Sequence, residues 1–359
     1  SSCQKVQGLL LDCYKTKSAR DFRKTNNSIT GVKMTICCGL EFTAHTFGVG
    51  LITNKGTILS DVRNMYTTEL GGIIPVKAAL HHRKIATEVI EKAIEKSKNK
   101  KIDLIAFSQG PGLPPCLHEG LKIAKDLAAD LKVPLIGVNH ICAHLEIGKL
   151  LTKVKDPVFL FTSGANTQII AFEGGKYRVF GECLSIALGN ALDKFGRAIG
   201  LGFPAGPLIE KLALHGKYVE LPYIVKGMDA EFSGIITKAI ELYKKGIAKE
   251  DLCYSLQETM FAMLTEVTER ALAHCNKKEV LLIGGVAANK RFCEMLEIMC
   301  KERNAKFYAV PIEYSGDNGI QIGWQGLLEY QSRKKFLPIE KLKINPVWRI
   351  DQVDVSWIK

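Results

Sequence analysis

The chain repeats one local pattern at two widely separated places, and this repetition limits the folds that are open to it. In each copy a short polar turn lies between two apolar segments typical of strands, and a glycine-containing turn leads to a third such segment. The copies span residues 35–60, with turns at 41–46 and 54–56, and residues 158–180, with turns at 163–167 and 173–175. The repeat predicts two related α/β domains that face a cleft.

Two further junctions place a glycine-rich turn between an apolar strand and a helix. The strands are expected at residues 102–107 and 280–283, and the helices at about 118–131 and 290–303. Free N–H groups at such a helix start suit a phosphate, although glycine also ends strands for steric reasons alone. Taken with the hydroxyl-rich turns of the repeat, the junctions favour a nucleotide-type ligand in the cleft.

His140 and His144 are the side chains most indicative of chemistry. Residues 133–138 predict a strand, Asn139 is a natural helix N-cap, and two imidazoles four residues apart then share one helical face. This spacing can hold a divalent metal, and the alternative is that both side chains only cap or pack. Ile141 stands where a metalloprotease carries its general base, which disfavours a protease. Asp317, in a glycine-flanked turn, is chemically suited to be a third ligand.

Composition narrows the class of protein. The 49 Lys and Arg exceed the 37 Asp and Glu by 12, which suits a polyanion such as RNA or describes a merely basic soluble protein. The 11 cysteines form no Cys-x-x-Cys pair, which indicates a reduced, intracellular chain. No apolar run is long enough to span a membrane.

The pattern also predicts the chain's organisation. Residues 1–33 are basic and polar and are expected to form an appended extension to a unit that begins near residue 34. The middle of the chain, about 185–275, is expected to be mostly helical. The expected helices there are 187–201, 205–215, 235–245 and 248–275, with a last helix from the turn at 315–319 to about residue 330.

Six motifs in a fixed order resemble one protein family over about residues 34–359. They are His140-Ile-Cys-Ala-His144, Thr162-Ser-Gly-Ala-Asn-Thr-Gln168, Gly189-Asn-Ala-Leu-Asp193, Gly202-Phe-Pro-Ala-Gly-Pro207, Gly284-Gly-Val-Ala-Ala-Asn289 and Gly316-Asp-Asn-Gly319. Together they resemble the archaeal and eukaryotic-cytosolic branch of the tRNA threonylcarbamoyladenosine synthases, the catalytic subunits of the KEOPS complex. The resemblance implies an α/β, actin-like and sugar-kinase-like (ASKHA) fold, with an N-terminal lobe at 34–155 and a C-terminal lobe at 156–359.

The resemblance also implies an activity and a set of site residues. The activity is transfer of threonylcarbamoyl from threonylcarbamoyl-AMP to N6 of the adenosine 3′ of the anticodon in ANN-decoding tRNAs, an acyltransferase reaction called t6A formation. His140, His144 and Asp317 would be catalytic and would bind one divalent metal, iron or zinc. The remaining implied residues contact the substrate: Phe161, Thr162, Ser163, Gly164 and Ala165 at the threonylcarbamoyl end, and Asp193, Gly206, Glu210 and Asn289 at the adenylate.

Simpler explanations stay open for several of these residues. Asp193 and Glu210 are also explained as solvated helix residues, and Gly206 as a turn former. Phe161 replaces a tyrosine usual in the family, Ala165 and Ala205 each replace a glycine, and Phe42 stands beside the first turn in place of a glycine. These departures motivate one alternative, a catalytically weak scaffold subunit.

A second alternative is an actin-like ATPase, which would need a catalytic Asp in the first hairpin turn, where Glu41 is the acid present.

The resemblance implies partners as well. They are tRNA, threonylcarbamoyl-AMP, a kinase-like ATPase subunit that docks on the C-terminal lobe, and a small dimerising subunit on helices of the N-terminal lobe. The expected location is the cytoplasm, without a membrane partner. Binding to tRNA through Lys and Arg should weaken steeply with salt.

Overall fold

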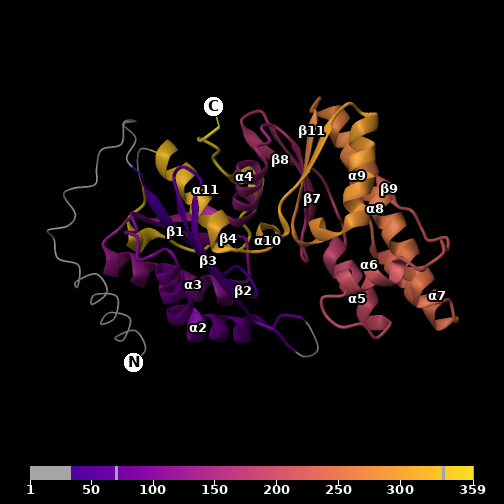
Figure 1. Cartoon of the computed structure of the whole chain (residues 1–359), viewed down its shortest axis with the longest axis horizontal. Coiled ribbons are helices and arrows are strands. Elements are labelled where there is room, and N and C mark those ends of the chain that lie inside the picture. The colour runs from indigo at the N-terminus through magenta and orange to yellow at the C-terminus, as the bar shows by residue number, and fades with distance from the viewer. Residues whose placement is uncertain (1–33, 69–71, 334–335, 359) are drawn as a thin grey trace.

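The computed structural model describes residues 34–68, 72–333 and 336–358, and the extension expected at 1–33 lies outside them. Figure 1 shows two halves side by side, the first around the early strands and the second around the later strands and most of the later helices. Among the described residues, no helix has the length and apolar character needed to cross a bilayer. The lobe boundary near residue 155 stays a prediction.

The first half is built on a five-stranded sheet. Its strands are β1 (Ile36–Glu41), β2 (Thr46–Thr53), β3 (Ile58–Met65), β4 (Leu104–Gly110) and β5 (Leu135–Asn139). The order is β3-β2-β1-β4-β5, with β1 to β3 antiparallel and β4 and β5 parallel to β1. The predicted strand–turn–strand repeat is therefore the antiparallel part of this sheet.

The second sheet repeats this topology. Its strands are β6 (Val158–Thr162), β7 (Thr167–Glu173), β8 (Lys176–Glu182), β11 (Glu279–Ile283) and β12 (Lys306–Ala309). The order β12-β11-β6-β7-β8 again combines an antiparallel meander with two strands parallel to the first. Two related α/β units, as the sequence repeat predicts, are confirmed.

Helices cover both faces of the first sheet. On one face α2 (Pro75–Lys96) and α3 (Pro114–Leu131) pack into an apolar cluster that includes Leu40 and Phe107. On the other face lie α4 (His140–Thr152) and α11 (Gly319–Ser332). The prediction that α3 begins at about residue 118 is wrong, because Pro114 opens the helix at a position where its missing N–H is not needed.

The helices of the second half match the sequence prediction within a few residues. They are α5 (Leu188–Ala198), α6 (Gly206–Ala213), α7 (Ser233–Lys244), α8 (Lys249–His274) and α9 (Lys290–Glu302). Met260, Leu264 and Val267 of α8 are fully or almost fully buried, as expected for core residues rather than a cofactor site. The short elements are β9 (Val225–Lys226), β10 (Asp229–Ala230), η2 (Gly285–Ala288), α10 (Ile312–Ser315), η3 (Ile339–Lys341) and η4 (Ile350–Gln352).

The α4 helix lies between the two sheets. Ile141 and Leu145 pack with Leu281 and other residues of the second sheet, whereas Ala143 and Ile147 pack with residues of the first sheet and of α11. The helix is therefore held from both sides by apolar contacts.

Glycines bring α11 unusually close to the first sheet. A Cβ on Gly39 of β1 would lie 2.1 Å from the carbonyl oxygen of Gly319 and 2.2 Å from the amide nitrogen of Gly323. A Cβ on Gly50 of β2 would lie 2.5 Å from the amide nitrogen of Ile320. Since these neighbours are backbone atoms, side chains larger than hydrogen would push the helix away. The start of α11, and the turn before it, are thereby placed against the first sheet.

Candidate metal centre and adjoining substrate site

A candidate metal centre forms where α4 meets the turn before α11. The Nε2 atoms of His140 and His144 lie 3.4 and 3.2 Å from the same oxygen, Oδ1 of Asp317. One ligand atom from each of the three residues lies within 4.8 Å of the others. Both imidazoles are buried. The fold therefore brings together the three residues implied as ligands, although Asp317 is 173 positions from His144 in the chain.

Local sequence explains how the histidines are presented. Asn139 ends β5, and its Oδ1 accepts the backbone N–H groups of Ile141 and Cys142, both at 3.0 Å. This N-cap closes the first turn of α4, as the sequence predicts. His140 and His144 then lie one above the other on one face, with ring centroids 4.6 Å apart.

Glu41, at the end of β1, holds His140 from the side away from Asp317. Its Oε2 lies 2.9 Å from Nδ1 of His140, and its Oε1 accepts the backbone N–H and the hydroxyl of Thr43 at 2.7 and 2.6 Å. A buried carboxylate behind a histidine is typical of the residues that surround metal ligands. Sequence reasoning missed this role, although a charged residue at the end of an apolar strand was a usable signal.

The start of α11 places Asp317 and sets the chemistry of His144. Asn318 is the N-cap, and its Oδ1 accepts the N–H of Gln321 at 2.9 Å. The Nδ2 of Asn318 donates to Oε1 of Gln321 at 3.1 Å, which directs the Gln321 amide nitrogen at Nε2 of His144, also at 3.1 Å. Nε2 of His144 therefore faces both the Gln321 amide nitrogen and Oδ1 of Asp317, and a neutral imidazole with its lone pair on Nε2 would serve as a metal ligand there.

The ionisable groups of the centre shift one another's pKa values. Burial opposes a charge on His140, but Glu41 and Asp317 outweigh it and raise the pKa of His140 to about 10. Burial lowers the pKa of His144. Burial also favours a neutral Asp317, yet the two imidazoles outweigh it and hold the pKa of that carboxyl well below its usual range. A carboxylate and two imidazole nitrogens around one point form a donor set that fits a divalent cation with room for a further ligand.

The turn after β6 leads from the metal centre toward α5. The ring of Phe161 lies 5.1 Å from that of His144 between centroids and is buried, and without an oxygen it donates no metal ligand. Ser163 closes the turn through its Oγ, which accepts the N–H of Asn166 at 3.0 Å. The carbonyl of Gly164 accepts the N–H of Asn190 at 3.0 Å, which joins the turn to the first turn of α5. Gly164 and Ala165 are exposed.

The four residues implied at the adenylate are joined through neighbouring backbone. Oδ1 of Asp193 accepts the N–H of Ala205, just before Gly206, at 2.7 Å, and burial raises the pKa of Asp193. Oε1 of Glu210 accepts the N–H of Lys290, which follows Asn289, at 2.8 Å. The structure therefore links α5, α6 and the start of α9.

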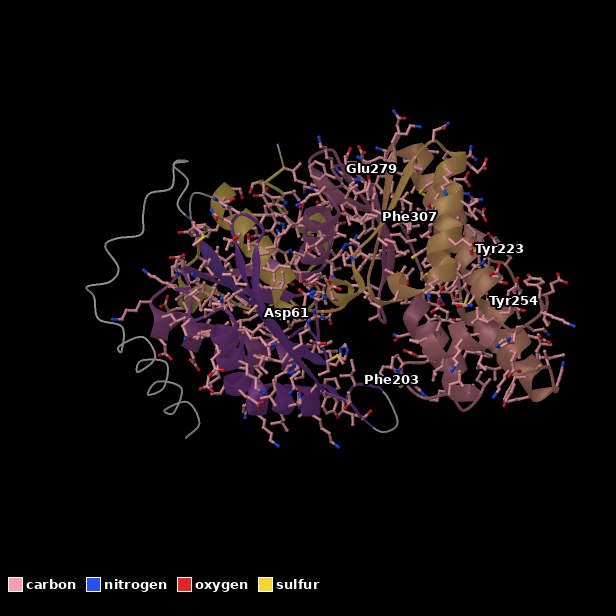
Figure 2. All side chains as sticks on the ribbon, in the orientation of Figure 1. Asp61, Phe203, Tyr223, Tyr254, Glu279 and Phe307 are labelled. Atoms are coloured by element: carbon pink, nitrogen blue, oxygen red, sulfur yellow. The ribbon has the colours of Figure 1, made fainter. Side chains whose placement is uncertain are left out.

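Asn289 serves mainly as a helix cap in this arrangement. Its Oδ1 accepts the N–H of Phe292 at 3.0 Å, and its Nδ2 donates to Gln257 at 2.6 Å. Figure 2 shows Phe203, in the loop between α5 and α6, on the side of the second half that faces the first. Asp61 of β3 lies toward the same central region, whereas Glu279, at the start of β11, lies near the upper edge.

Two substitutions that depart from the family pattern are absorbed by neighbouring glycines. The ring of Phe42 is fully buried and packs on Gly120, where a Cβ would lie 2.0 Å from it. The methyl of Ala205 is buried against Gly196, where a Cβ would lie 2.2 Å from it. Both groups therefore lie inside the protein rather than in the space before a turn.

Proteins of known structure share this architecture at low sequence identity. HypF from T. kodakarensis matches with a TM-score of 0.59 and 16% identity, over 83% of this chain and 48% of HypF. The activator of 2-hydroxyisocaproyl-CoA dehydratase from Clostridium difficile matches with a TM-score of 0.51 and 12% identity, over 85% of this chain and 100% of the activator. The protein is thus an α/β protein of the actin-like, sugar-kinase-like class, as its motifs implied.

Sequence comparison defines the family within that class. Residues 57–324 match the family described as TsaD: tRNA N6-adenosine threonylcarbamoyltransferase. A Thermococcus sibiricus protein with that enzyme name is 52% identical over 326 residues, 90% of this chain and 100% of the relative. A probable bifunctional tRNA threonylcarbamoyladenosine biosynthesis protein from Methanocaldococcus jannaschii is 52% identical over 325 residues, and the match spans 61% of it. The chain belongs to the TsaD family, and the resemblance inferred from its motifs is confirmed.

Proposed function

We propose that this chain is an acyltransferase that moves threonylcarbamoyl from threonylcarbamoyl-AMP to N6 of the adenosine 3′ of the anticodon in ANN-decoding tRNAs. Membership of the TsaD family supports the reaction type. The observation that carries the proposal is the convergence of His140, His144 and Asp317 beside the turn at Phe161. The N6–carbamoyl bond forms, the bond to AMP breaks, and AMP and a proton are released.

The metal centre in this proposal holds one divalent ion, iron or zinc. Nε2 of His140, Nε2 of His144 and Oδ1 of Asp317 are its ligands, and Glu41 fixes the orientation of His140. When bound, such an ion supplies a Lewis acid and template for the carbonyl or the carboxylate of the threonylcarbamoyl group. Phe161 contributes an apolar wall in place of a fourth side-chain ligand.

The remaining site residues position the two ends of the substrate. The turn at residues 161–165, whose Gly164 and Ala165 are exposed, would receive the threonylcarbamoyl end. Asp193 and Glu210 would accept the ribose hydroxyls, and Asn289 would approach the adenylate from the turn before α9, where its side chain also caps the helix and donates to Gln257. The exocyclic amine is a poor nucleophile, so positioning should account for most of the acceleration.

The proposed partners follow from the same assignment. They are tRNA and, within a KEOPS complex in the cytoplasm, a kinase-like ATPase subunit and a small dimerising subunit. The net charge of +12 supports contact with the phosphates of tRNA. Binding to tRNA should lose affinity steeply between low and physiological salt.

A transfer assay tests the proposal. The purified chain, with and without the partner subunits, receives labelled threonylcarbamoyl-AMP and an unmodified ANN-decoding tRNA, and metal content is measured on the same sample. Label in the tRNA is expected, and the His140→Ala/His144→Ala double variant should lose both metal and transfer while keeping its fold. Full activity of that variant would refute the metal role, and no transfer with intact complex assembly would favour the scaffold alternative.

A further inference from the structure

Residues 343–358 contact elements of both sheets, and this segment is called the C-terminal strap here. It begins on β4, where Gln109 donates from its side chain to the carbonyl of Lys343 at 2.6 Å and accepts the N–H of Asn345 at 2.8 Å. Further along, Ile350, Val353 and Val355 are buried in the apolar cluster that α4 forms with the second sheet. The proposed function assigns no role to the C-terminal strap.

The strap contacts α4 just before the histidine pair. Asn139 caps α4 with its side-chain oxygen, and with its side-chain nitrogen it donates to the backbone carbonyl of Trp348 at 3.1 Å. The residue that sets the first turn of the helix is thus itself held by the strap.

The strap contacts α4 again just after the pair, at Glu146. This side chain is buried, and its Oε1 accepts the indole N–H of Trp357 at 2.8 Å as well as the hydroxyl of Tyr177 from β8. Lys149 pairs with the other oxygen at 3.4 Å. A buried carboxylate that binds several donors holds its place strongly, because each broken bond leaves a charge poorly paired.

We propose that the strap positions the metal helix, with Glu146, Trp357 and Tyr177 as positioning residues for the His140–His144 pair. Apolar packing holds α4 between the sheets, and the hydrogen bonds before and after the histidine pair add directional contacts that fix one rotation of the helix. Glu146 lies about 200° around the helix from His144, so its hydrogen bonds hold the side of α4 that faces away from the metal ligands. The hydrogen bonds at Asn139 and Glu146 lie on either side of the histidine pair in the sequence. They therefore fix the rotation of α4 about its axis, and with it the position of both imidazoles relative to Asp317.

This inference rests on the metal site of the proposed function, so zinc binding by the chain of residues 1–359 tests both. Affinity for Zn²⁺ is measured by competition with a chromophoric chelator, alongside the melting temperature and hydrogen exchange of the α4 amides. The test variant is Trp357→Phe/Tyr177→Phe, which keeps an aromatic ring at both positions and removes two of the donors to Glu146 while Lys149 stays. The matched control is Trp348→Phe, because the contact of Trp348 with Asn139 uses its backbone carbonyl.

The double variant should bind Zn²⁺ about tenfold more weakly, as loss of groups that orient metal ligands does, and its α4 amides should exchange faster. The control should keep wild-type affinity. Glu146→Gln, which retains an accepting oxygen, should bind zinc more tightly than Glu146→Leu, a difference that tests orientation rather than helix burial.

Wild-type affinity and exchange in the double variant would overturn the positioning role. A wild-type chain that binds no zinc would instead refute the metal site, and the inference with it.

Discussion

The glycine contact between β1 and α11 gives a sharp test of how Asp317 is placed. In Gly39→Ala the added Cβ would lie 2.1 Å from the carbonyl oxygen of Gly319 and 2.2 Å from the amide nitrogen of Gly323. Ordinary contacts of carbon begin near 3.5 Å, so α11 must move outward by roughly 1 Å or more. Overpacking of this kind typically costs about 1–3 kcal/mol, and with backbone on both sides the upper end is expected.

The displacement should be felt at the metal centre because Asp317 directly precedes the N-cap of α11. Gly39→Ala should therefore lower the melting temperature by several degrees and also weaken binding of Zn²⁺ in the chelator competition assay. Gly234→Ala in α7 is the control, since its Cβ would meet only Ile224 at an ordinary 3.7 Å. Unchanged stability and unchanged zinc affinity in Gly39→Ala would show that α11 is not held by this contact.

Three further predictions address single groups. Glu41→Gln keeps a polar side chain behind His140 but removes its charge, so zinc affinity measured by competition should fall about 10-fold or more; equal affinity would refute the role of that carboxylate. Asp193→Ala should weaken binding of AMP in calorimetry without releasing metal, and loss of metal would mean that Asp193 belongs to the other part of the site. Burial raises the pKa of Glu329 to about 7 against the opposing effect of Arg333, so stability linked to its proton is present at pH 4 and is lost as the pH rises through 7. Glu329→Gln should therefore gain stability over the wild type between pH 5 and 8, by up to about 3 kcal/mol, in denaturation curves across that range; parallel curves at all pH values would contradict this.

Much of the secondary structure could be predicted because its signals are local. The three-strand repeat, the glycine turns and the N-cap at Asn139 each depend on neighbouring residues, and the observed strands agree within a few positions. The pairing of His140 with His144 is also local, since one helical turn brings the two rings together. Boundaries were less reliable, as the early start of α3 at Pro114 illustrates.

The sequence by itself determined the strands, most helices, the histidine pair and, through its motifs, the family. Only the tertiary structure decided that Asp317 meets the pair, that Glu41 lies behind His140, and that the last tryptophan reaches Glu146. The burial of the Phe42 ring also depends on Gly120, which contacts that ring although it lies 78 positions later in the chain. Such contacts leave no periodic signal in the chain, because they depend on how sheets and helices pack rather than on the residues beside them.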